Sequence, residues 1–154
     1  MSATFPPELW EDPYFLTTRA ATALHALCRK ALRDAGVTDL NPAQLAVLAM
    51  LDEDEGRSAT LLARRLHCEK SSLTPMLGKL EANGHLLRAR DPKDGRLQRL
   101  FLTKKGRRRR REAEVLVQKA TEAALGDLSR KVLRHHVEFC QALLTALGEV
   151  ATSA

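Results

Sequence analysis

The stretch ARDPKDGRLQRLFLTKKG, residues 89–106, decides the fold that this sequence predicts. A proline and an Asp–Gly pair, which are typical of tight turns, stand between two runs that favour strands, at residues 85–90 and 97–102. In the first run, Leu87 and Ala89 alternate with arginines, as they would on a strand with one buried face. The sequence therefore predicts a small basic β-hairpin. A two-stranded sheet is barely stable alone in water, so we expect it to pack against helices.

The rest of the chain has the periodicity of helices. Small and apolar residues recur at helical spacing over residues 8–34, which predicts one long N-terminal helix. Asn41 followed by Pro42 is a strong start signal for a second helix, which we expect to run to about Leu51. A last helix is expected at about residues 128–150. The predicted fold is therefore mainly α, with one small β-hairpin.

Two short helices directly before the hairpin form a predicted helix-turn-helix. Ser58 can cap the first helix, and a four-residue turn, HCEK, leads to the second at residues 71–84. Both helices have apolar residues at positions i, i+3, i+4 and i+7, and Gly84 can adopt the left-handed conformation that ends a helix. Pro75 is expected so near the start of the second helix that its missing N–H breaks no hydrogen bond.

The opposite face of the second of these helices suits the major groove of DNA. Its residues are small, polar or basic and include no acid: Ser71, Ser72, Thr74, Pro75, Gly78 and Lys79. Small residues permit a close approach, and hydroxyl and Lys side chains can bond to base edges and phosphates. The same pattern also fits an ordinary amphipathic helix with a solvated face, so this face alone leaves both interpretations open.

A helix-turn-helix followed directly by a basic hairpin is a winged helix, and this combination favours the DNA interpretation. Arg90, Lys93 and Arg96 are cations of the predicted wing. An Arg on a narrow projection suits the minor groove, where the negative potential is enhanced. Asp94 could hold Arg96 in place, so we include it among the predicted DNA contacts. The plainer alternative is that Asp94 and Arg96 form only a weak surface ion pair.

The basic charge of the chain is confined to one segment. The net charge of the 154 residues is +6, whereas residues 64–111 hold 16 Lys/Arg and 4 Asp/Glu, a net charge of +12. Residues 1–63 have a net charge of −4, and residues 112–154 have a net charge of −2. This confinement indicates a binding surface for a polyanion, because a generally alkaline protein would spread its charge.

Five successive arginines, at residues 107–111, lie near the start of a further predicted helix that Thr103 can cap. Successive helical residues point about 100° apart, so these arginines cannot all face one surface. Most of them are expected to be solvated and to pair with acids one turn along the helix, Arg108 with Glu112 and Arg110 with Glu114. The alternative is that one or two of them contact phosphates that flank the wing.

Apolar stripes on the first and last predicted helices indicate a dimer. Their residues have the spacing of a heptad seam and are Leu16, Ala20, Leu133, Val137, Cys140, Leu144 and Leu147. Two such stripes most simply pack on each other and on a second copy of the chain. A two-fold dimer would place its two recognition helices in successive major grooves of a pseudo-palindromic site. Packing within one chain is the alternative.

With its elements in this order, the chain resembles the MarR family of bacterial transcription regulators over essentially its whole length. The wing carries the most specific part of the resemblance, an Asp, a small residue and an Arg, followed by apolar residues and Leu-Thr-x-x-Gly. The matching residues are Asp94, Gly95, Arg96, Leu102, Thr103 and Gly106. Many members have Arg in place of Gly95, so the wing tip of this chain carries one positive charge fewer than theirs. The recognition helix, with LTPML at residues 73–77, is similar to the branch that senses organic hydroperoxides, but the sensing cysteine of that branch is missing here.

The resemblance implies a homodimeric repressor that binds double-stranded DNA at a palindromic promoter site and releases it when a small aromatic or phenolic ligand binds. It implies an N-terminal dimerisation helix at residues 1–36, a winged helix-turn-helix at 37–106, and C-terminal helices at 107–154 that complete the dimerisation region. We expect no cofactor and no metal. The effector crevice would lie near residues that could equally belong to the core or the dimer interface: Trp10, Tyr14, Phe15, His25 and Cys28.

The cysteines favour a reducing compartment, because Cys28, Cys68 and Cys140 are odd in number, widely spaced and without a CxxC motif. No apolar run approaches the ~18–20 residues of a membrane span, and the first residues lack the pattern of a secretion signal. We therefore expect a cytoplasmic protein without a membrane partner.

We weighed three alternative functions against the sequence. Cys68 stands in the predicted turn beside His67 and Lys70, and its oxidation would disturb DNA contact, so the chain could be a redox-sensing regulator of the same fold. A winged helix that binds DNA without sequence preference would show a steep salt dependence. An enzyme is not expected, because the sequence contains no GxSxG, P-loop or HExxH motif. His136 and Cys140 are only two potential metal ligands, too few for a site.

Overall fold

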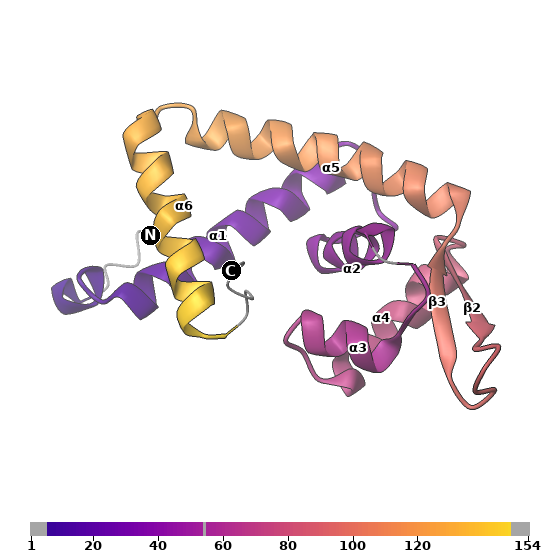
Figure 1. The fold of residues 1–154 in the computed structure, drawn as a ribbon. Coiled ribbons are helices and arrows are strands. Elements are labelled where there is room, and N and C mark those ends of the chain that lie inside the picture. Colours follow the sequence, from indigo (N-terminus) through magenta and orange to yellow (C-terminus); the bar gives the residue numbers. More distant parts are fainter. Residues whose placement is uncertain (1–5, 54, 149–154) are drawn as a thin grey trace. The chain divides into compact units, whose positions relative to one another are not determined.

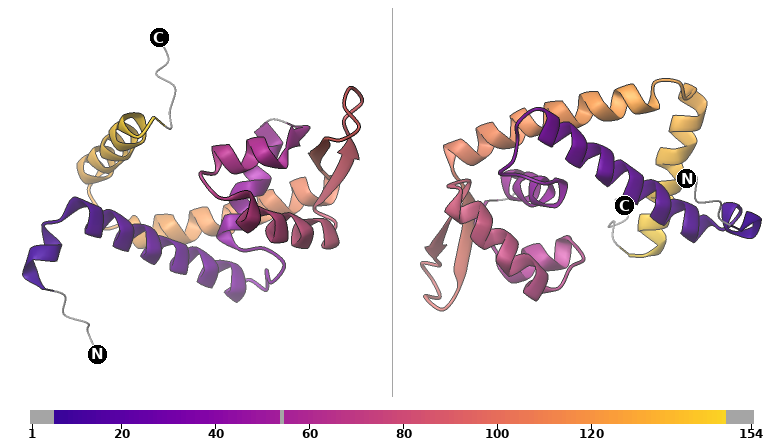
Figure 2. Two further views of the ribbon diagram at one scale, coloured as in Figure 1. Left: turned by 90° about the horizontal axis from the view of Figure 1, so that it is seen from below. Right: turned by 180° about the vertical axis from the view of Figure 1, so that it is seen from behind.

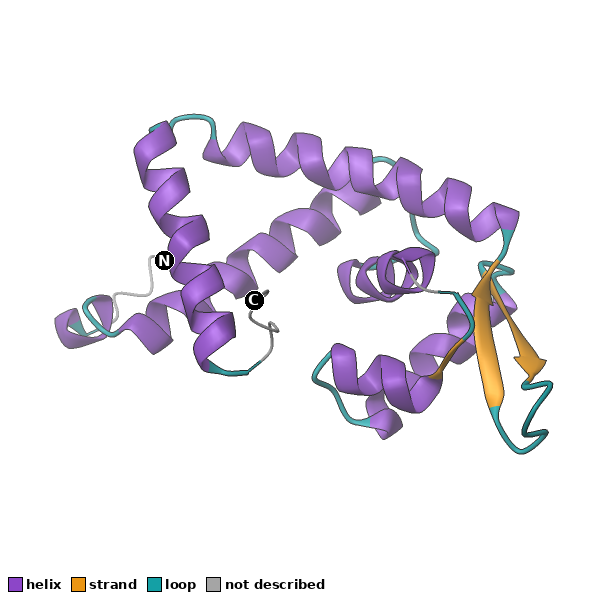
Figure 3. Cartoon of the chain, in the orientation of Figure 1, coloured by secondary structure: helices purple, strands orange, loops and turns teal. Residues whose placement is uncertain are grey.

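The computed structural model describes residues 6–53 and 55–148, which are mainly helical with one small sheet (Figures 1 and 3). In this part of the chain the elements are η1, a short 3₁₀ helix (Pro7–Trp10), α1 (Pro13–Asp34), α2 (Pro42–Glu53), β1 (Arg57–Ser58), α3 (Ala59–Arg65), α4 (Lys70–Ala82), β2 (Leu86–Arg90), β3 (Gln98–Leu102), α5 (Lys104–Leu125) and α6 (Arg130–Ala146). The helix-turn-helix α3–α4 is followed directly by the hairpin β2–β3, so the predicted winged helix-turn-helix is confirmed.

The N-terminal helix predicted over residues 8–34 is divided, and the prediction is wrong for its first residues. Helix η1 ends at Trp10, and α1 begins only at Pro13. The carboxylate of Asp12 caps α1 by accepting a hydrogen bond of 2.6 Å from the N–H of Phe15. A proline is favoured at the first position of a helix, where no N–H is needed, and it cannot continue a helix that precedes it.

The sheet has three strands, although the sequence predicted only two. The hairpin strands are antiparallel, with Leu86 opposite Leu102 and Arg90 opposite Gln98. Strand β1 pairs antiparallel with the other edge of β3, and the strand order is β1-β3-β2. A strand of two residues is too short to show a period-two pattern, so no periodicity predicted β1. Because β1 directly precedes α3, it ties the hairpin to the helix-turn-helix.

The predicted helix start and stop signals are confirmed by the hydrogen bonds. The side chains of Ser58 and Thr103 each accept a hydrogen bond from the backbone N–H three residues later, at 3.2 and 2.9 Å. Asn41 and Gln44 form a reciprocal pair in which each side chain accepts from the other's N–H at 2.9 Å. Gly84 has a φ of 71°, the left-handed conformation expected after α4.

An aliphatic core holds α2, α3, α4 and the sheet together. Its most buried side chains are leucines of these elements: Leu48, Leu51, Leu62, Leu73, Leu77, Leu80, Leu86 and Leu100. Leu32 from the end of α1 and Ala113 from α5 join the same cluster. Each buried leucine stabilises the fold by about 1.5–3 kcal/mol relative to an exposed one, so this cluster fixes where α4 and the wing lie.

The chain divides into two compact units between Thr121 and Glu122, within α5. The first unit contains α1 to α4, the sheet and most of α5, and Figure 2 shows these elements from two further sides. The second unit contains α6, which is capped by the side chain of Ser129 and has no buried residue. Within the described residues, no helix has the length and apolar character that crossing a membrane requires.

Candidate nucleic-acid interface

The two faces of α4 differ as the sequence predicted. Leu73, Leu77 and Leu80 are buried in the core. The predicted contact residues on the other face are all exposed: Ser71, Ser72, Thr74, Pro75, Gly78 and Lys79. The hydroxyl of Thr74 donates a hydrogen bond of 2.8 Å to the carbonyl of Lys70, so its oxygen can still accept a further hydrogen bond.

Pro75 lies deeper in α4 than the sequence indicated. The helix begins at Lys70, so an N–H at position 75 would have bonded to the carbonyl of Ser71. The expectation that Pro75 costs no helical hydrogen bond is therefore wrong, since proline has no N–H to donate to the Ser71 carbonyl. Both residues lie on the exposed face of α4 that was predicted to contact bases.

The turn between α3 and α4 has the predicted four residues but lies one residue earlier than predicted, at 66–69 instead of 67–70, because Leu66 is the C-cap of α3 and Lys70 begins α4. His67 takes a positive φ of 47°, and the N–H of Cys68 donates a hydrogen bond of 3.1 Å to the carbonyl of Ala63. The Cys68 side chain is exposed, whereas Cys28 is buried. A redox role of Cys68 stays a prediction. Within the described residues, no group of His, Cys, Asp and Glu side chains is large enough to hold a metal ion.

The wing turn is shaped by Asp91, a residue that the sequence reading left out of the site. Its side chain is almost fully buried and accepts hydrogen bonds from the N–H groups of Lys93 and Asp94, at 2.7 and 3.2 Å. It also accepts from the guanidinium of Arg99 on β3. The backbone N–H of Lys93 and then Arg99 lower the pKa of Asp91, so the carboxylate stays charged. An Asp at the start of a turn was the available signal.

Asp94 acts on the backbone of the wing tip. Its carboxylate accepts a hydrogen bond of 3.0 Å from the N–H of Arg96, so it holds the main chain of Arg96 and leaves the guanidinium to solvent. The turn projects from the helical part of the winged helix, as Figure 1 shows.

The exposed cations of α4 and the wing have no partner among the residues that the structure describes. The side chains of Lys79, Arg90, Lys93 and Arg96 make no hydrogen bond or ion pair with residues 6–53 or 55–148. Lysine and arginine side chains that are not neutralised within the protein can neutralise phosphates and release their counterions. These four cations, with the exposed face of α4, define what we call the reading surface.

The arginine run of α5 is arranged differently, because much of its charge is paired within the winged helix. Arg107 pairs with Asp52 at 2.7 Å and also with Glu55, and Arg110 pairs with Asp52 at 2.8 Å. The expected pairs along the helix, Arg108 with Glu112 and Arg110 with Glu114, are confirmed at 3.6 and 2.9 Å. The acids of α2 and of the segment after it were not expected as partners, because they are far from the arginines in the sequence and no local pattern connects the two segments.

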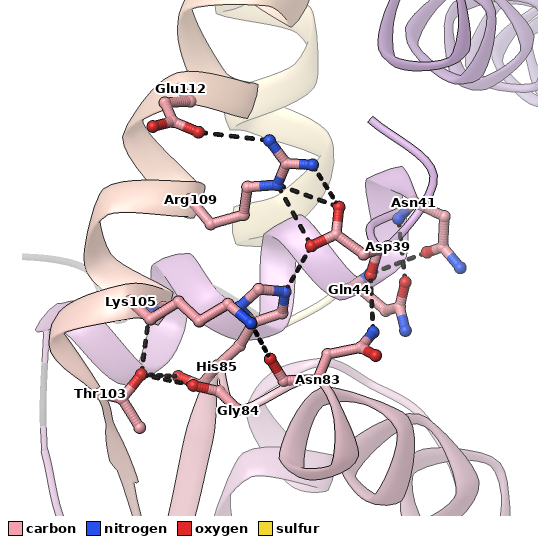
Figure 4. A network of polar contacts seen from close by, with 11 residues as sticks. Asp39, Asn41, Gln44, Asn83, Gly84, His85, Thr103, Lys105, Arg109 and Glu112 are labelled. Carbon is pink, nitrogen blue, oxygen red and sulfur yellow. Dashed lines mark hydrogen bonds and ion pairs between the residues drawn. The ribbon is translucent and has the colours of Figure 1, made fainter. Parts of the chain in front are cut away.

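Asp39, in the loop before α2, is the centre of a second set of contacts (Figure 4). Arg109 of α5 donates to its carboxylate through Nε at 3.0 Å and through Nη2 at 2.5 Å. The fully buried His85 lies with its Nε2 2.8 Å from the other carboxylate oxygen, and Asn83 donates to the Asp39 carbonyl at 3.2 Å. The Arg109 guanidinium, with His85, lowers the pKa of Asp39 to about 2. We call Asp39, Asn83, His85 and Arg109 the Asp39 network.

Thr103 and the first turn of α5 also contact the backbone between α4 and β2. The hydroxyl of Thr103 donates to the carbonyl of Gly84 at 2.7 Å, and Lys105 donates to that of Asn83 at 2.7 Å. A Cβ atom on Gly106 would lie 1.9 Å from the carbonyl oxygen of His85, so only glycine fits there. The Thr-x-x-Gly pattern of the sequence therefore marks the place where α5 meets the winged helix.

The predicted effector residues are spread along the N-terminal part of the chain. Trp10 and Tyr14 are mostly exposed, His25 is exposed and Cys28 is buried. Tyr14 and Cys28 are separated by about 21 Å along the axis of α1, because each helical residue rises ~1.5 Å. One small ligand could contact only some of these residues, and their role stays a prediction.

The predicted dimer residues of α6 leave an apolar stripe largely uncovered. Val137 and Leu147 are 52% and 64% exposed, Leu144 is exposed, and Leu133 and Cys140 are half-buried. On α1, Leu16 is half-buried and Ala20 is exposed. The predicted dimer residues are therefore mainly exposed at the C-terminal helix, whereas on α1 only Ala20 is exposed.

A profile described as the MarR family matches residues 40–97, from the loop before α2 to the wing tip. The regulator TtmR of Methylorubrum extorquens is 39% identical over 101 residues, which are 63% of this chain and about half, 52%, of TtmR. The transcriptional activatory protein BadR of Rhodopseudomonas palustris is 30% identical over 141 residues, which are 89% of this chain and 79% of BadR.

Solved structures have the same fold. The transcriptional repressor CouR bound to a 23-mer DNA duplex is 31% identical, with a TM-score of 0.80 over 94% of this chain and 99% of that one. CouR from Rhodococcus jostii RHA1, bound to p-coumaroyl-CoA, is 25% identical, with a TM-score of 0.74 over 90% of this chain and 95% of that one. The fold and the relatives define a winged-helix transcription regulator. The chain belongs to the MarR family.

Proposed function

We propose that the protein is a homodimeric repressor that binds a pseudo-palindromic promoter site through its reading surface and is released by a small-molecule effector. The observation that carries this proposal is the pairing pattern of the cations. Among the described residues, the cations of α4 and the wing lack protein partners and lie on the elements that a winged helix presents to DNA. CouR, a relative of similar fold, is bound to a DNA duplex, which supports double-stranded DNA as the partner.

The homodimer is supported by the uncovered apolar residues of α1 and α6. Tyr14 is 82% exposed and Leu147 is 64% exposed, and α6 has no buried residue. A monomer rarely leaves so much apolar helix surface in water, and a two-fold partner would cover the same stripe on both copies. In this proposal residues 1–36 and 107–154 supply the dimerisation region, and residues 37–106 read the DNA.

The effector in this proposal is an aromatic acid, a phenol or a thioester of such an acid. A CouR structure contains p-coumaroyl-CoA, a phenolic acid joined to coenzyme A. The predicted crevice near Trp10, Tyr14, Phe15, His25 and Cys28 offers aromatic and apolar side chains to such a ring.

The test is the affinity of the full chain for its own upstream DNA and for a random duplex of equal length, measured at one salt concentration. We expect the upstream DNA to bind at least about 10³-fold more tightly, as specific regulators do. Equal affinities would contradict a sequence-specific repressor and favour a protein that binds DNA by charge alone, since such binding is insensitive to sequence. Addition of p-coumaroyl-CoA or p-coumarate to the specific complex then tests release.

A further inference from the structure

The first turns of α5 are joined to the winged helix at several separate places. Arg109 contacts Asp39 before α2, whereas Arg107 and Arg110 contact Asp52 near the end of α2. Thr103 bonds to the backbone just after α4, at the start of the wing. Contacts at both ends of α2 and at the end of α4 constrain rotation as well as distance, so α5 is fixed in direction relative to the recognition helix.

These ion pairs are suited to setting an orientation more than to adding stability. The side chains of Arg109, Arg110, Asp39 and Asp52 are only 17–28% exposed, so each pair has lost much of its hydration. Partly buried ion pairs often stabilise a protein less than apolar residues of similar size, because of the cost of desolvation. A guanidinium, however, holds a carboxylate in a defined plane and direction, which an apolar contact does not.

Orientation determines which DNA sites a dimer can bind. In a two-fold dimer, each recognition helix must reach a major groove about 34–36 Å from the other, along one face of the duplex. One extra base pair between the half-sites moves them ~3.4 Å apart and turns them by about 34°. A winged helix held firmly on α5 cannot follow that change, whereas a loosely held one can.

We propose that the ion pairs of Arg107, Arg109 and Arg110 with Asp39 and Asp52 are specificity determinants that fix the half-site spacing which the protein accepts. These arginines are positioning residues, because they act through α5 and need not touch DNA. The inference rests on the proposed homodimer and its two half-sites.

The experiment uses duplexes selected from a random library by the full-length wild-type protein. Affinities are measured at one salt concentration for the selected duplex and for duplexes with one base pair added or removed at its centre. The variant is Arg109→Gln, which removes the charge that holds Asp39. The matched control is Arg108→Gln, which makes the same change of charge one residue away, at a side chain that is 76% exposed.

We expect the change of spacing to weaken binding of the wild type and of Arg108→Gln by about tenfold or more, comparable to the loss of a base contact. For Arg109→Gln the same change should cost about threefold or less, in the range of one phosphate contact. If Arg109→Gln lowered the affinity for every duplex by one common factor, its role would be purely structural and the inference would be overturned.

A second variant, Arg107→Gln, keeps the test decisive should Arg109→Gln not fold, because Asp52 retains its pair with Arg110. We expect the same loss of spacing discrimination, and discrimination equal to the wild type's would overturn the inference. A wild-type protein that selected no sequence would overturn the proposed function itself, whereas one that selected a sequence but bound all spacings equally would overturn the inference alone. The failure of the inference and that of the proposed function are therefore distinguishable.

Discussion

The wing and the start of α5 are both rich in arginine, but the structure uses their charge in different ways. On the wing, Arg90 and Arg96 have no ion-pair partner among the described residues. On α5, Arg109 pairs with Asp39 before α2, and Arg107 and Arg110 pair with Asp52 near the end of α2. The net charge of +12 in residues 64–111 therefore overstates the charge that is available to DNA. A basic segment indicates a binding surface only after its internal ion pairs have been subtracted.

The largest effect is expected from Gly106→Ala, which tests how closely α5 is held. The added methyl group would overlap the carbonyl of His85, so α5 or β2 must move. We expect the free energy of unfolding, measured with urea, to fall by about 2–3 kcal/mol or more. Gly78→Ala is the control, since a Cβ at exposed Gly78 has no atom within 4 Å. There the same change should raise stability by up to about 1 kcal/mol, because alanine favours a helix. Equal effects at the two sites would mean that α5 and β2 separate easily.

Two variants test the different uses of charge in the wing and in α5: Arg96→Ala on the wing and Arg110→Gln on α5. Loss of Arg96 should weaken DNA binding by about 1–3 kcal/mol, reduce the salt dependence of binding and leave the free energy of unfolding unchanged. Loss of Arg110 should instead lower the free energy of unfolding by about 1–2 kcal/mol, because Asp52 loses a partner in a partly buried site. Fluorescence anisotropy with labelled duplex and urea unfolding measure the two quantities. Unchanged DNA affinity in Arg96→Ala would remove the wing tip from the reading surface.

The Asp39 network predicts a loss of stability in acid. The pKa of Asp39 is lowered from 3.8 to about 2, so its ionised form stabilises the fold above about pH 4. This stabilisation, at most about 2 kcal/mol, is lost as the pH falls through the folded-state pKa of about 2. The difference in unfolding free energy between the wild type and Asp39→Asn should therefore shrink between about pH 4 and pH 2. Parallel curves for the two proteins would show that Arg109 contributes little to holding Asp39.

A smaller effect in the opposite direction is expected from Gly95→Arg, which adds to the wing tip the charge that many family members have. A Cβ at Gly95 meets no atom within 4 Å, so the side chain can be accommodated without strain. We expect tighter DNA binding by about 0.5–1 kcal/mol and a log–log salt slope that is steeper by about 1. A gain without a change of slope would mean that the new arginine contacts something other than phosphate.

The sequence predicted the elements that depend on local signals. The hairpin, the turn of the helix-turn-helix, the caps at Ser58 and Thr103 and the exposed face of α4 all follow from spacing and turn residues. The break before Pro13 was also visible in Asp12-Pro13, but the apolar periodicity of residues 8–34 concealed it. Local patterns predicted neither β1, which is too short, nor the depth of Pro75 in its helix.

The candidate site was predictable only in part, because its supporting contacts join residues far apart in the chain. The exposure of Lys79, Lys93 and Arg96 follows from helix phase and turn chemistry. The pairing of Arg109 with Asp39 spans 70 residues, and no periodicity connects them. The number of basic residues was therefore evident in the sequence. The acids that pair with some of them, and so make their charge unavailable to DNA, depend on the tertiary fold.

The hydrogen bonds at the start of α5 also determine where this chain can change in length. Thr103 donates to the backbone carbonyl of Gly84, its hydroxyl accepts from the N–H of Gly106, and Gly106 lies close against the carbonyl of His85, one helical turn along from Thr103. An inserted or deleted residue between them would turn Gly106 away from His85 and bring a side chain to a place where none fits. The wing tip has no such constraint at Gly95. Relatives of this protein should therefore differ in the length of the wing loop while keeping the segment from Thr103 to Gly106 at a constant length.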